Sequence, residues 1–130
     1  MKRIFFTLTL LAGVQLISDQ EGMARAAFDF VEQGLPVCSI VIAESPSPAA
    51  RLAALELQCH VVKITGVEIP IRSENEPVEG RRILVGESSM TRRFGLRGGD
   101  FEPQEYLVAF RPDTIILIGR DWEDTEANRK

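Results

Sequence analysis

Few side chains in this chain combine the types and the spacing that catalysis requires. Two carboxylates about 5–10 Å apart in a cleft can act as acid and base in glycoside cleavage, and the nearest candidates are Asp100, Glu102 and Glu105. Because they lie on a glycine-rich loop and at a strand start, with no barrel mouth to hold a sugar, we interpret them as solvated loop charges. Cys59 and His60 could supply a nucleophile and a base. Adjacent residues of a helix point about 100° apart, so these two do not face each other. We therefore predict no catalytic residue.

The two cysteines are the other reactive side chains. Cys38 and Cys59 could form a disulfide in an oxidising compartment, provided that their Cα atoms come within about 7 Å. Cys59 is expected on the face of a helix that points away from the sheet, which favours two free thiols.

The basic and aromatic side chains suggest binding rather than catalysis. A concentration of arginines could hold an acidic sugar or a phosphate, or could be a solvated surface: Arg81, Arg82, Arg92, Arg93 and Arg97. Tyr106 and Trp122 could stack on a sugar ring, although they lie far apart in the sequence.

Length and composition exclude several classes of protein. The chain has 130 residues, 45% of them hydrophobic and 26% charged, as expected of one globular domain. Its net charge of −4 argues against nucleic acid or an anionic membrane as a partner. Two cysteines and one histidine cannot build a four-ligand Cys/His zinc site. We predict no metal and no cofactor.

The first 26 residues have the pattern of a secretory signal. A basic start, Met1-Lys2-Arg3, precedes an apolar run over 4–17, and Ala24-Arg25-Ala26 matches a cleavage site. The run is shorter than the ~20 residues of a membrane anchor, so a secreted or periplasmic location is predicted. The alternative is an amphipathic first helix of the domain.

The remaining pattern predicts an α+β (α/β two-layer) fold with a mixed β-sheet of about five strands. The expected order is β-α-β-β-(short α)-β-β, with one main helix packed on one face. Strands are expected at 38–43, 67–72, 81–86, 104–110 and 114–119, the main helix at 48–64 and a short helical turn within 88–95. Pro112 and Asp113 are the expected turn of a hairpin.

The main helix carries two apolar stripes. Ser47 is a good N-cap, Pro48 a good first residue and Gly66 a good C-terminal stop. One stripe should face the sheet: Ala50, Ala54, Leu57, Val61 and Ile64. The opposite stripe holds Leu52, Leu55, Cys59 and Val62. A two-layer domain does not need it, so it is either an interaction face or scattered surface leucines.

One helix cannot cover both faces of five strands. The strands nevertheless contain apolar residues that need burial on both faces: Ile40, Ile42, Leu84, Leu107, Ile116 and Ile118. We therefore expect one face of the sheet to be uncovered, and the domain to be incomplete by itself.

Several segments carry a resemblance to a known family. They are Ser39–Glu44 (SIVIAE), Ser47–Gln58 (SPAARLAALELQ), Lys63–Ile71 (KITGVEIPI), Ile83–Ser88 (ILVGES), and the strand residues of 105–121. Over residues 37–121 the chain resembles the N-terminal α/β accessory domain of α-glucuronidases and β-N-acetylhexosaminidases. That domain precedes a catalytic (β/α)₈ barrel.

The resemblance implies a non-catalytic domain that packs against and positions a catalytic barrel or another subunit. In such proteins a second helix follows the last strand, and the charged tail 122–130 would be its start. Cys59 and His60 depart from the family pattern. The residues expected to contact the partner are Leu52, Leu55, Cys59 and Val62. The alternatives are a free-standing carbohydrate-binding module, with polysaccharide as partner, and a small hydrolase.

Overall fold

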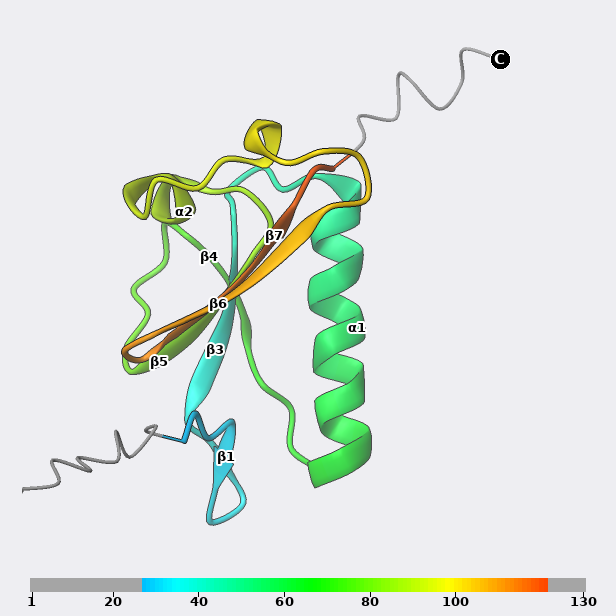
Figure 1. Cartoon of the computed structure of the whole chain (residues 1–130). Coiled ribbons are helices and arrows are strands. Elements are labelled where there is room, and N and C mark those ends of the chain that lie inside the picture. Colours follow the sequence, from blue (N-terminus) through cyan, green and yellow to red (C-terminus); the bar gives the residue numbers. More distant parts are fainter. Residues whose placement is uncertain (1–26, 122–130) are drawn as a thin grey trace, which may run out of the picture.

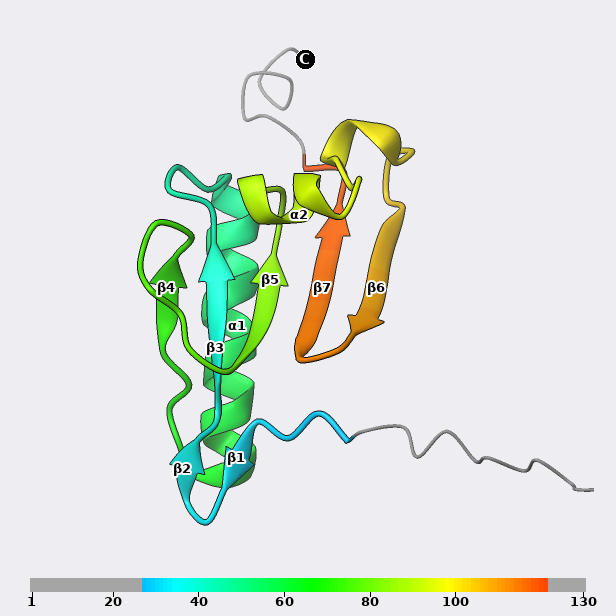
Figure 2. The same ribbon diagram turned by 90° about the vertical axis from the view of Figure 1, so that its left-hand side faces the viewer.

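The structure, a computed structural model, describes residues 27–121 (Figure 1). A mixed five-stranded sheet has the order β4-β3-β5-β7-β6. Its strands are β3 (Cys38–Ile42), β4 (Ile71–Ser73), β5 (Arg81–Val85), β6 (Tyr106–Arg111) and β7 (Thr114–Gly119). β3 is parallel to β4 and β5, β5 is parallel to β7, and β6 is antiparallel to β7 (Figure 2). The predicted α+β fold with one main helix is confirmed.

The main helix, α1 (Pro48–Thr65), has the predicted ends. The Ser47 hydroxyl accepts a hydrogen bond from the Ala50 N–H at 3.0 Å. Gly66 has φ 73° and donates its N–H to the Val62 carbonyl at 2.8 Å, which closes the last turn. These local signals fix the helix before any packing is considered.

The prediction is wrong for one residue of the stripe that was expected to face the sheet. Ala50, Ala54 and Val61 are buried against the sheet, but Ile64 is 82% exposed. The helix has 18 residues, which is about 27 Å, whereas a five-residue strand spans about 17 Å. The last turn of α1 therefore extends past the sheet, and Ile64 has no strand beneath it.

The strand expected at 67–72 is much shorter than predicted. Only Ile71–Ser73 forms β4. Pro70 lacks an N–H and cannot donate to the ladder, although its carbonyl accepts from the Ile40 N–H at 2.9 Å. The Gln58 side chain instead holds this segment to α1, through its donor bond to the Ile69 carbonyl at 2.8 Å.

A small hairpin before residue 37 was not predicted. β1 (Val31–Glu32) and β2 (Leu35–Pro36) pair antiparallel, and both turn residues, Gln33 and Gly34, have positive φ. That geometry is typical of a two-residue hairpin turn. Arg81 ties the hairpin to the sheet through an ion pair with Glu32 at 2.9 Å.

The face of the sheet under α1 is packed as expected. Its buried apolar residues come from α1, from three strands and from the segment before β4: Cys38, Ile40, Ala54, Val61, Ile69, Ile83, Val85 and Ile115. Phe28 and Phe30, with ring centroids 5.5 Å apart in an edge-to-face contact, pack against this core.

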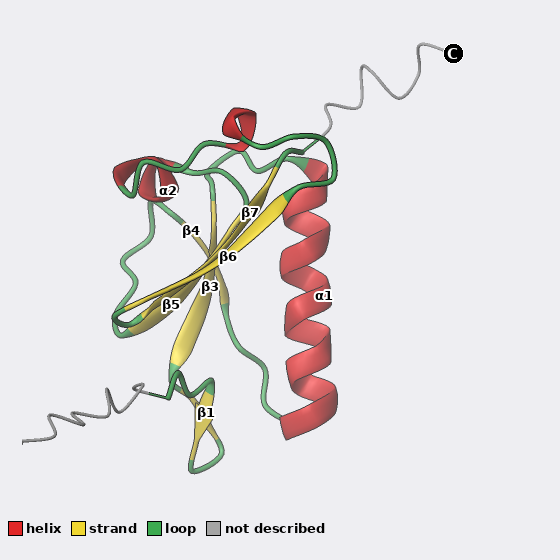
Figure 3. Cartoon of the chain, viewed as in Figure 1, coloured by secondary structure: helices red, strands yellow, loops and turns green. Residues whose placement is uncertain are grey.

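The expectation that the opposite face is uncovered is wrong. Leu84 and Ile116 are 0% exposed and Ile118 is 3% exposed. The loop after β4 and the short helix α2 (Ser89–Arg93) lie on the side of the sheet away from α1, and the 3₁₀ turn at Gly98–Asp100 lies above the end of the sheet (Figure 3). They contribute partly buried side chains: Val78, Met90, Leu96 and Phe101. Connecting segments, rather than a second helix layer, close this core.

Candidate functional site

The outer stripe of α1 is exposed as predicted. We use this name for Leu52, Leu55, Cys59 and Val62. Leu52 is 60% exposed, Leu55 is 51% exposed and Val62 is 37% exposed, and Cys59 is exposed as well. Because they lie on consecutive turns, they form one apolar band along the helix. The capped 18-residue helix presents this band on a rigid support.

A second apolar surface lies beside α1, over the strand that the helix does not reach. Tyr106, Val108 and Phe110 on β6 are 77%, 44% and 56% exposed. A groove of about 340 Å³ runs between β6 and β7 on one side and the first turns of α1 on the other, where Ala49 and Ala53 line it. We call this groove, with the exposed β6 side chains, the β6 trough. It is the part of the sheet that remains uncovered.

Sequence reasoning missed the β6 trough, although a signal for it was present. Every residue from Tyr106 to Phe110 is apolar, whereas a strand with one wet face alternates polar and apolar residues. Leu107 and Ala109 pack into the core that faces α2. The residues that alternate with them, Tyr106, Val108 and Phe110, therefore lie on the α1 side of the sheet, where the single helix does not cover them.

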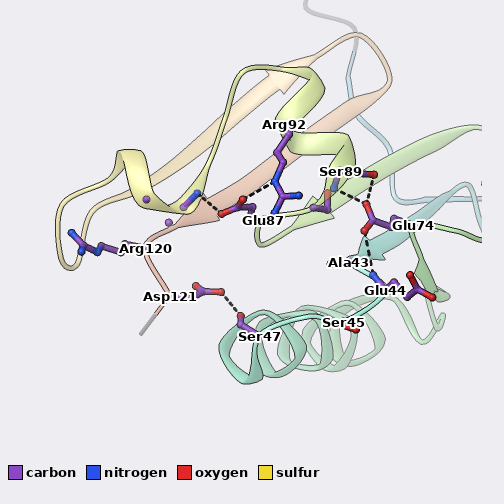
Figure 4. A pocket seen from close by; sticks show the side chains of 14 residues that line it. Ala43, Glu44, Ser45, Ser47, Glu74, Glu87, Ser89, Arg92, Arg120 and Asp121 are labelled. Carbon is purple, nitrogen blue, oxygen red and sulfur yellow. Dashed lines mark hydrogen bonds and ion pairs between the residues drawn. The ribbon is translucent and has the colours of Figure 1, made fainter. Parts of the chain in front are cut away.

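A polar cleft lies at the carboxyl ends of β3, β5 and β7 (Figure 4). Its volume is about 560 Å³. The chain leaves β3 toward α1 and leaves β5 toward α2, on opposite faces of the sheet, so this is a topological switch point, where open α/β sheets bind ligands. The polar side chains that line it include Glu44, Ser47, Glu74, Glu87, Arg92, Arg120 and Asp121.

Most of the carboxylates in the polar cleft already have structural partners. Glu74 accepts hydrogen bonds from the Ser89 N–H at 2.7 Å and the Ser89 hydroxyl at 2.6 Å, and from the Glu44 N–H at 3.3 Å. Asp121 accepts a hydrogen bond from the Ser47 hydroxyl. The Glu74 contacts join the start of α2 to the end of β3, and the Asp121 contact joins the end of β7 to the start of α1.

Glu87 has the strongest charge partner in the polar cleft. It accepts from Arg92 Nε at 2.8 Å and from the Gly98 N–H at 2.8 Å. The Arg92 hydrogen bond is the main cause that lowers the pKa of Glu87, and the Gly98 bond adds to it. For Glu74, burial alone would raise the pKa, but its hydrogen bonds with Ser89 and Glu44 lower the pKa below the ordinary range.

These directions do not suit Glu74 or Glu87 for the role of general acid. A glycosidase acid needs a raised pKa so that it stays protonated at neutral pH. Glu74 and Glu87 are both shifted the other way, and their oxygens accept hydrogen bonds from α2 and from the backbone of Glu44 and Gly98. The polar cleft therefore has the chemistry of a structural hydrogen-bond network that offers polar groups at its rim.

The lowered pKa of Glu87 predicts a loss of stability in acid. The folded-state pKa lies below the unfolded value of about 4.3. The stabilisation is therefore present above that value and is lost as the pH falls through the folded-state pKa. We expect Glu87→Gln to cost about 1 kcal/mol at pH 7, after allowance for solvent exposure, and to flatten the acid side of the stability curve.

Urea unfolding between pH 7 and pH 3 measures this effect. Glu68→Gln, at an exposed glutamate with no side-chain hydrogen bond in the structure, should leave both the stability at pH 7 and the acid-side slope unchanged. Equal slopes for the parent and Glu87→Gln would contradict the role given to the Arg92 contact.

The predicted loop carboxylates lie away from the polar cleft. Asp100, Glu102 and Glu105 are exposed, and Glu105 accepts a hydrogen bond from the Glu102 N–H at 2.7 Å. None of the three lines the polar cleft. Glu105 instead lines the β6 trough. Their interpretation as solvated loop charges agrees with this placement.

The cysteines and the histidine do not form a reactive pair. His60 Nδ1 lies 2.8 Å from the Glu56 carbonyl oxygen and 3.8 Å from the Glu56 carboxylate, on the exposed side of α1. Cys38 is buried, and burial raises its pKa to about 11. Both cysteines are free thiols in the structure, as the sequence favoured.

The arginine concentration separates into two regions in the structure. Arg81 and Arg82 begin β5, where Arg81 contacts Asp29, Glu32 and Asp113. Arg92 reaches the polar cleft at the opposite end of the sheet. The aromatic candidates are not joined either: Tyr106 lines the β6 trough, and Trp122 lies outside the described residues.

Within residues 27–121, no group of three or more His, Cys, Asp or Glu side chains is arranged to hold a metal ion. The same residues contain no helix that combines the length and the apolar character of a membrane span. The predicted signal at 1–26 and the tail at 122–130 lie outside the described residues.

Comparison with known proteins gives no match: no family model, no curated protein and no solved structure is significantly similar to this chain.

Proposed function

We propose that this chain is an exported, non-catalytic accessory domain of a glycoside-hydrolase-like, carbohydrate-active protein. Its role is to pack against a catalytic (β/α)₈ barrel, or against another subunit, and to position it. The outer stripe of α1 is the contact face. The observation that carries this proposal is the exposure of Leu52 and Leu55, at 60% and 51%, on a helix whose other face already fills the core.

Burial of that stripe supplies a physical reason to associate. Covering a leucine side chain with a partner removes apolar surface from water at about 25 cal/mol per Å². Four apolar residues on one rigid band lose little conformational freedom when they dock, because the helix is already formed. The resemblance over residues 37–121 supports a barrel as the partner, and the signal-like pattern of residues 1–26 supports export.

The state of the carboxylates supports the absence of catalysis. Glu74 and Glu87 have lowered pKa values and engaged oxygens, so neither is suited to donate a proton at neutral pH. We expect the purified chain to release no nitrophenol from a panel of aryl-glycosides and aryl-glucuronides. Turnover that disappears in Glu74→Gln or Glu87→Gln would overturn the non-catalytic assignment.

A free-standing carbohydrate-binding module is the second candidate. The observation that favours it is the polar cleft at the switch point, where Arg120 and the carboxylates could hydrogen-bond sugar hydroxyls. Titration with a panel of oligosaccharides separates the two candidates. Saturable binding that Arg120→Ala abolishes would favour the module, whereas weak and unsaturable signals for every sugar would favour the accessory domain.

A further inference from the structure

The outer edge of β6 is an unprotected sheet edge. β6 and β4 are the two edge strands of the sheet. β4 has only three residues, and Pro70 precedes it; short edge strands and prolines discourage pairing with other chains. β6 has six residues, YLVAFR, with neither proline nor lysine. Among the described residues no strand pairs with its outer edge, which Figure 2 shows at the right-hand side of the sheet.

The hairpin geometry determines which backbone groups face this edge. Pro112 and Asp113 form a two-residue turn, and Arg111 pairs with Thr114 beside it. That closing pair is hydrogen-bonded in a two-residue hairpin, and along the ladder such pairs alternate with pairs whose polar groups point away. Val108 and Tyr106 therefore direct their backbone groups outward.

We propose that β6 pairs antiparallel with β6 of a second copy of this chain, in the register that places Val108 opposite Val108. A two-fold axis perpendicular to the sheet then passes through this pair. The outward N–H and C=O of Val108 bond with those of the second copy. Tyr106 lies opposite Phe110 of the second copy, so that an aromatic pair forms on each side of the axis.

The charges next to β6 fit this register. Glu105 precedes the strand and Arg111 ends it. The same register therefore brings Glu105 of each copy opposite Arg111 of the other copy. Arg111 lies on the same face of the strand as Leu107 and Ala109, since side chains alternate, and Glu105, the residue just before the strand, is exposed. Directly opposed charges of unlike sign stabilise a strand pair, whereas like charges destabilise it.

The pairing also covers the β6 trough from its open side. A two-fold axis perpendicular to the sheet keeps the same face of both copies on one side. The exposed Tyr106, Val108 and Phe110 side chains of both copies then adjoin between the two α1 helices. The outer stripe of α1 points away from this contact, so self-pairing and docking of a larger partner use different surfaces.

Sedimentation equilibrium of the full chain and of charge variants tests the proposal. We expect a monomer–dimer equilibrium whose dissociation constant rises about tenfold or more in Arg111→Glu, which opposes Glu105 with a second glutamate. Glu105→Arg should have the same effect. The double variant Glu105→Arg/Arg111→Glu restores opposite charges and should return to within about threefold of the parent.

Controls distinguish this register from nonspecific association. Val108→Lys should abolish the dimer, while Val62→Lys on the outer stripe, at similar exposure (37% against 44%), should leave it intact. Far-ultraviolet circular dichroism checks that each variant is folded. A chain that stays monomeric up to about 1 mM, a dimer unaffected by the single charge reversals, or a double variant as weak as the single ones would overturn the proposal.

Discussion

Gly86→Ala is expected to destabilise the fold by about 2–5 kcal/mol, far more than the addition of one methyl group normally costs. Gly86 directly follows β5 and has φ +76°, and a Cβ at this position would lie 2.5 Å from the Ala50 Cβ. The left-handed backbone strains any L side chain, and the overlap would push α1 away from the sheet. Urea unfolding at pH 7 measures the loss as a lower midpoint with an unchanged slope.

Gly66→Ala is the matched control. Gly66 has nearly the same φ, +73°, but a Cβ there would meet nothing within 4 Å. The substitution should cost only the backbone strain, about 1 kcal/mol. The difference between the two variants isolates the contact between β5 and α1. Equal losses for both variants would show that α1 does not lie as close to Gly86 as the structure places it.

Leu84→Ala is expected to cost about 2–5 kcal/mol. Leu84 is 0% exposed in the core between the sheet and the α2 side of the molecule. A cavity at this site cannot collapse easily, because strands on both sides of β5 fix its neighbours. Calorimetry and chemical unfolding both report the change, as a lower melting temperature and a lower urea midpoint.

Leu52→Ala removes the same atoms from the outer stripe. Leu52 is 60% exposed, so its loss should change the stability of the isolated chain by no more than about 0.5 kcal/mol. A loss below about 1 kcal/mol for Leu84→Ala would mean that the α2 side of the sheet is open after all. A large loss for Leu52→Ala would mean that the outer stripe is already covered within the chain.

Features set by neighbouring residues were predictable from the sequence. Ser47, Pro48 and Gly66 act through bonds within one turn of the helix, so both ends of α1 were correct. The hairpin at Pro112–Asp113 was correct for the same reason. The exposure of Leu52, Leu55 and Val62 follows from helical period alone.

Features that depend on how distant segments meet were not predictable. The loops around Val78, Leu96 and Phe101 show no period, yet they close the α2 side of the sheet. Ile64 follows the apolar stripe in sequence but lies past the end of the strands. The strand at β4 is shorter than its apolar pattern because Pro70 and the Gln58 contact hold the preceding residues outside the ladder.

The candidate surfaces show the same division. The outer stripe was found because one helix contains all of it. To predict the β6 trough, one must know that the sheet is wider than the single helix that covers it. To predict the polar cleft, one must know that the ends of three strands and the start of α2 lie together. Glu74 carried no sequence signal, because its partner Ser89 is brought near only by the folded loops, and the bond between Glu87 and the Gly98 N–H depends on the same folding.

The alkylation rate of Cys59 tests the central claim most directly, since this thiol lies on the outer stripe. Cys38 serves as an internal reference, because it is buried and its pKa is raised to about 11. We expect iodoacetamide to modify Cys59 rapidly in the free chain and much more slowly with a saturating catalytic barrel of an α-glucuronidase or β-N-acetylhexosaminidase that lacks its own N-terminal domain. Slow modification in the free chain, or an unchanged rate with the barrel present, would contradict the account.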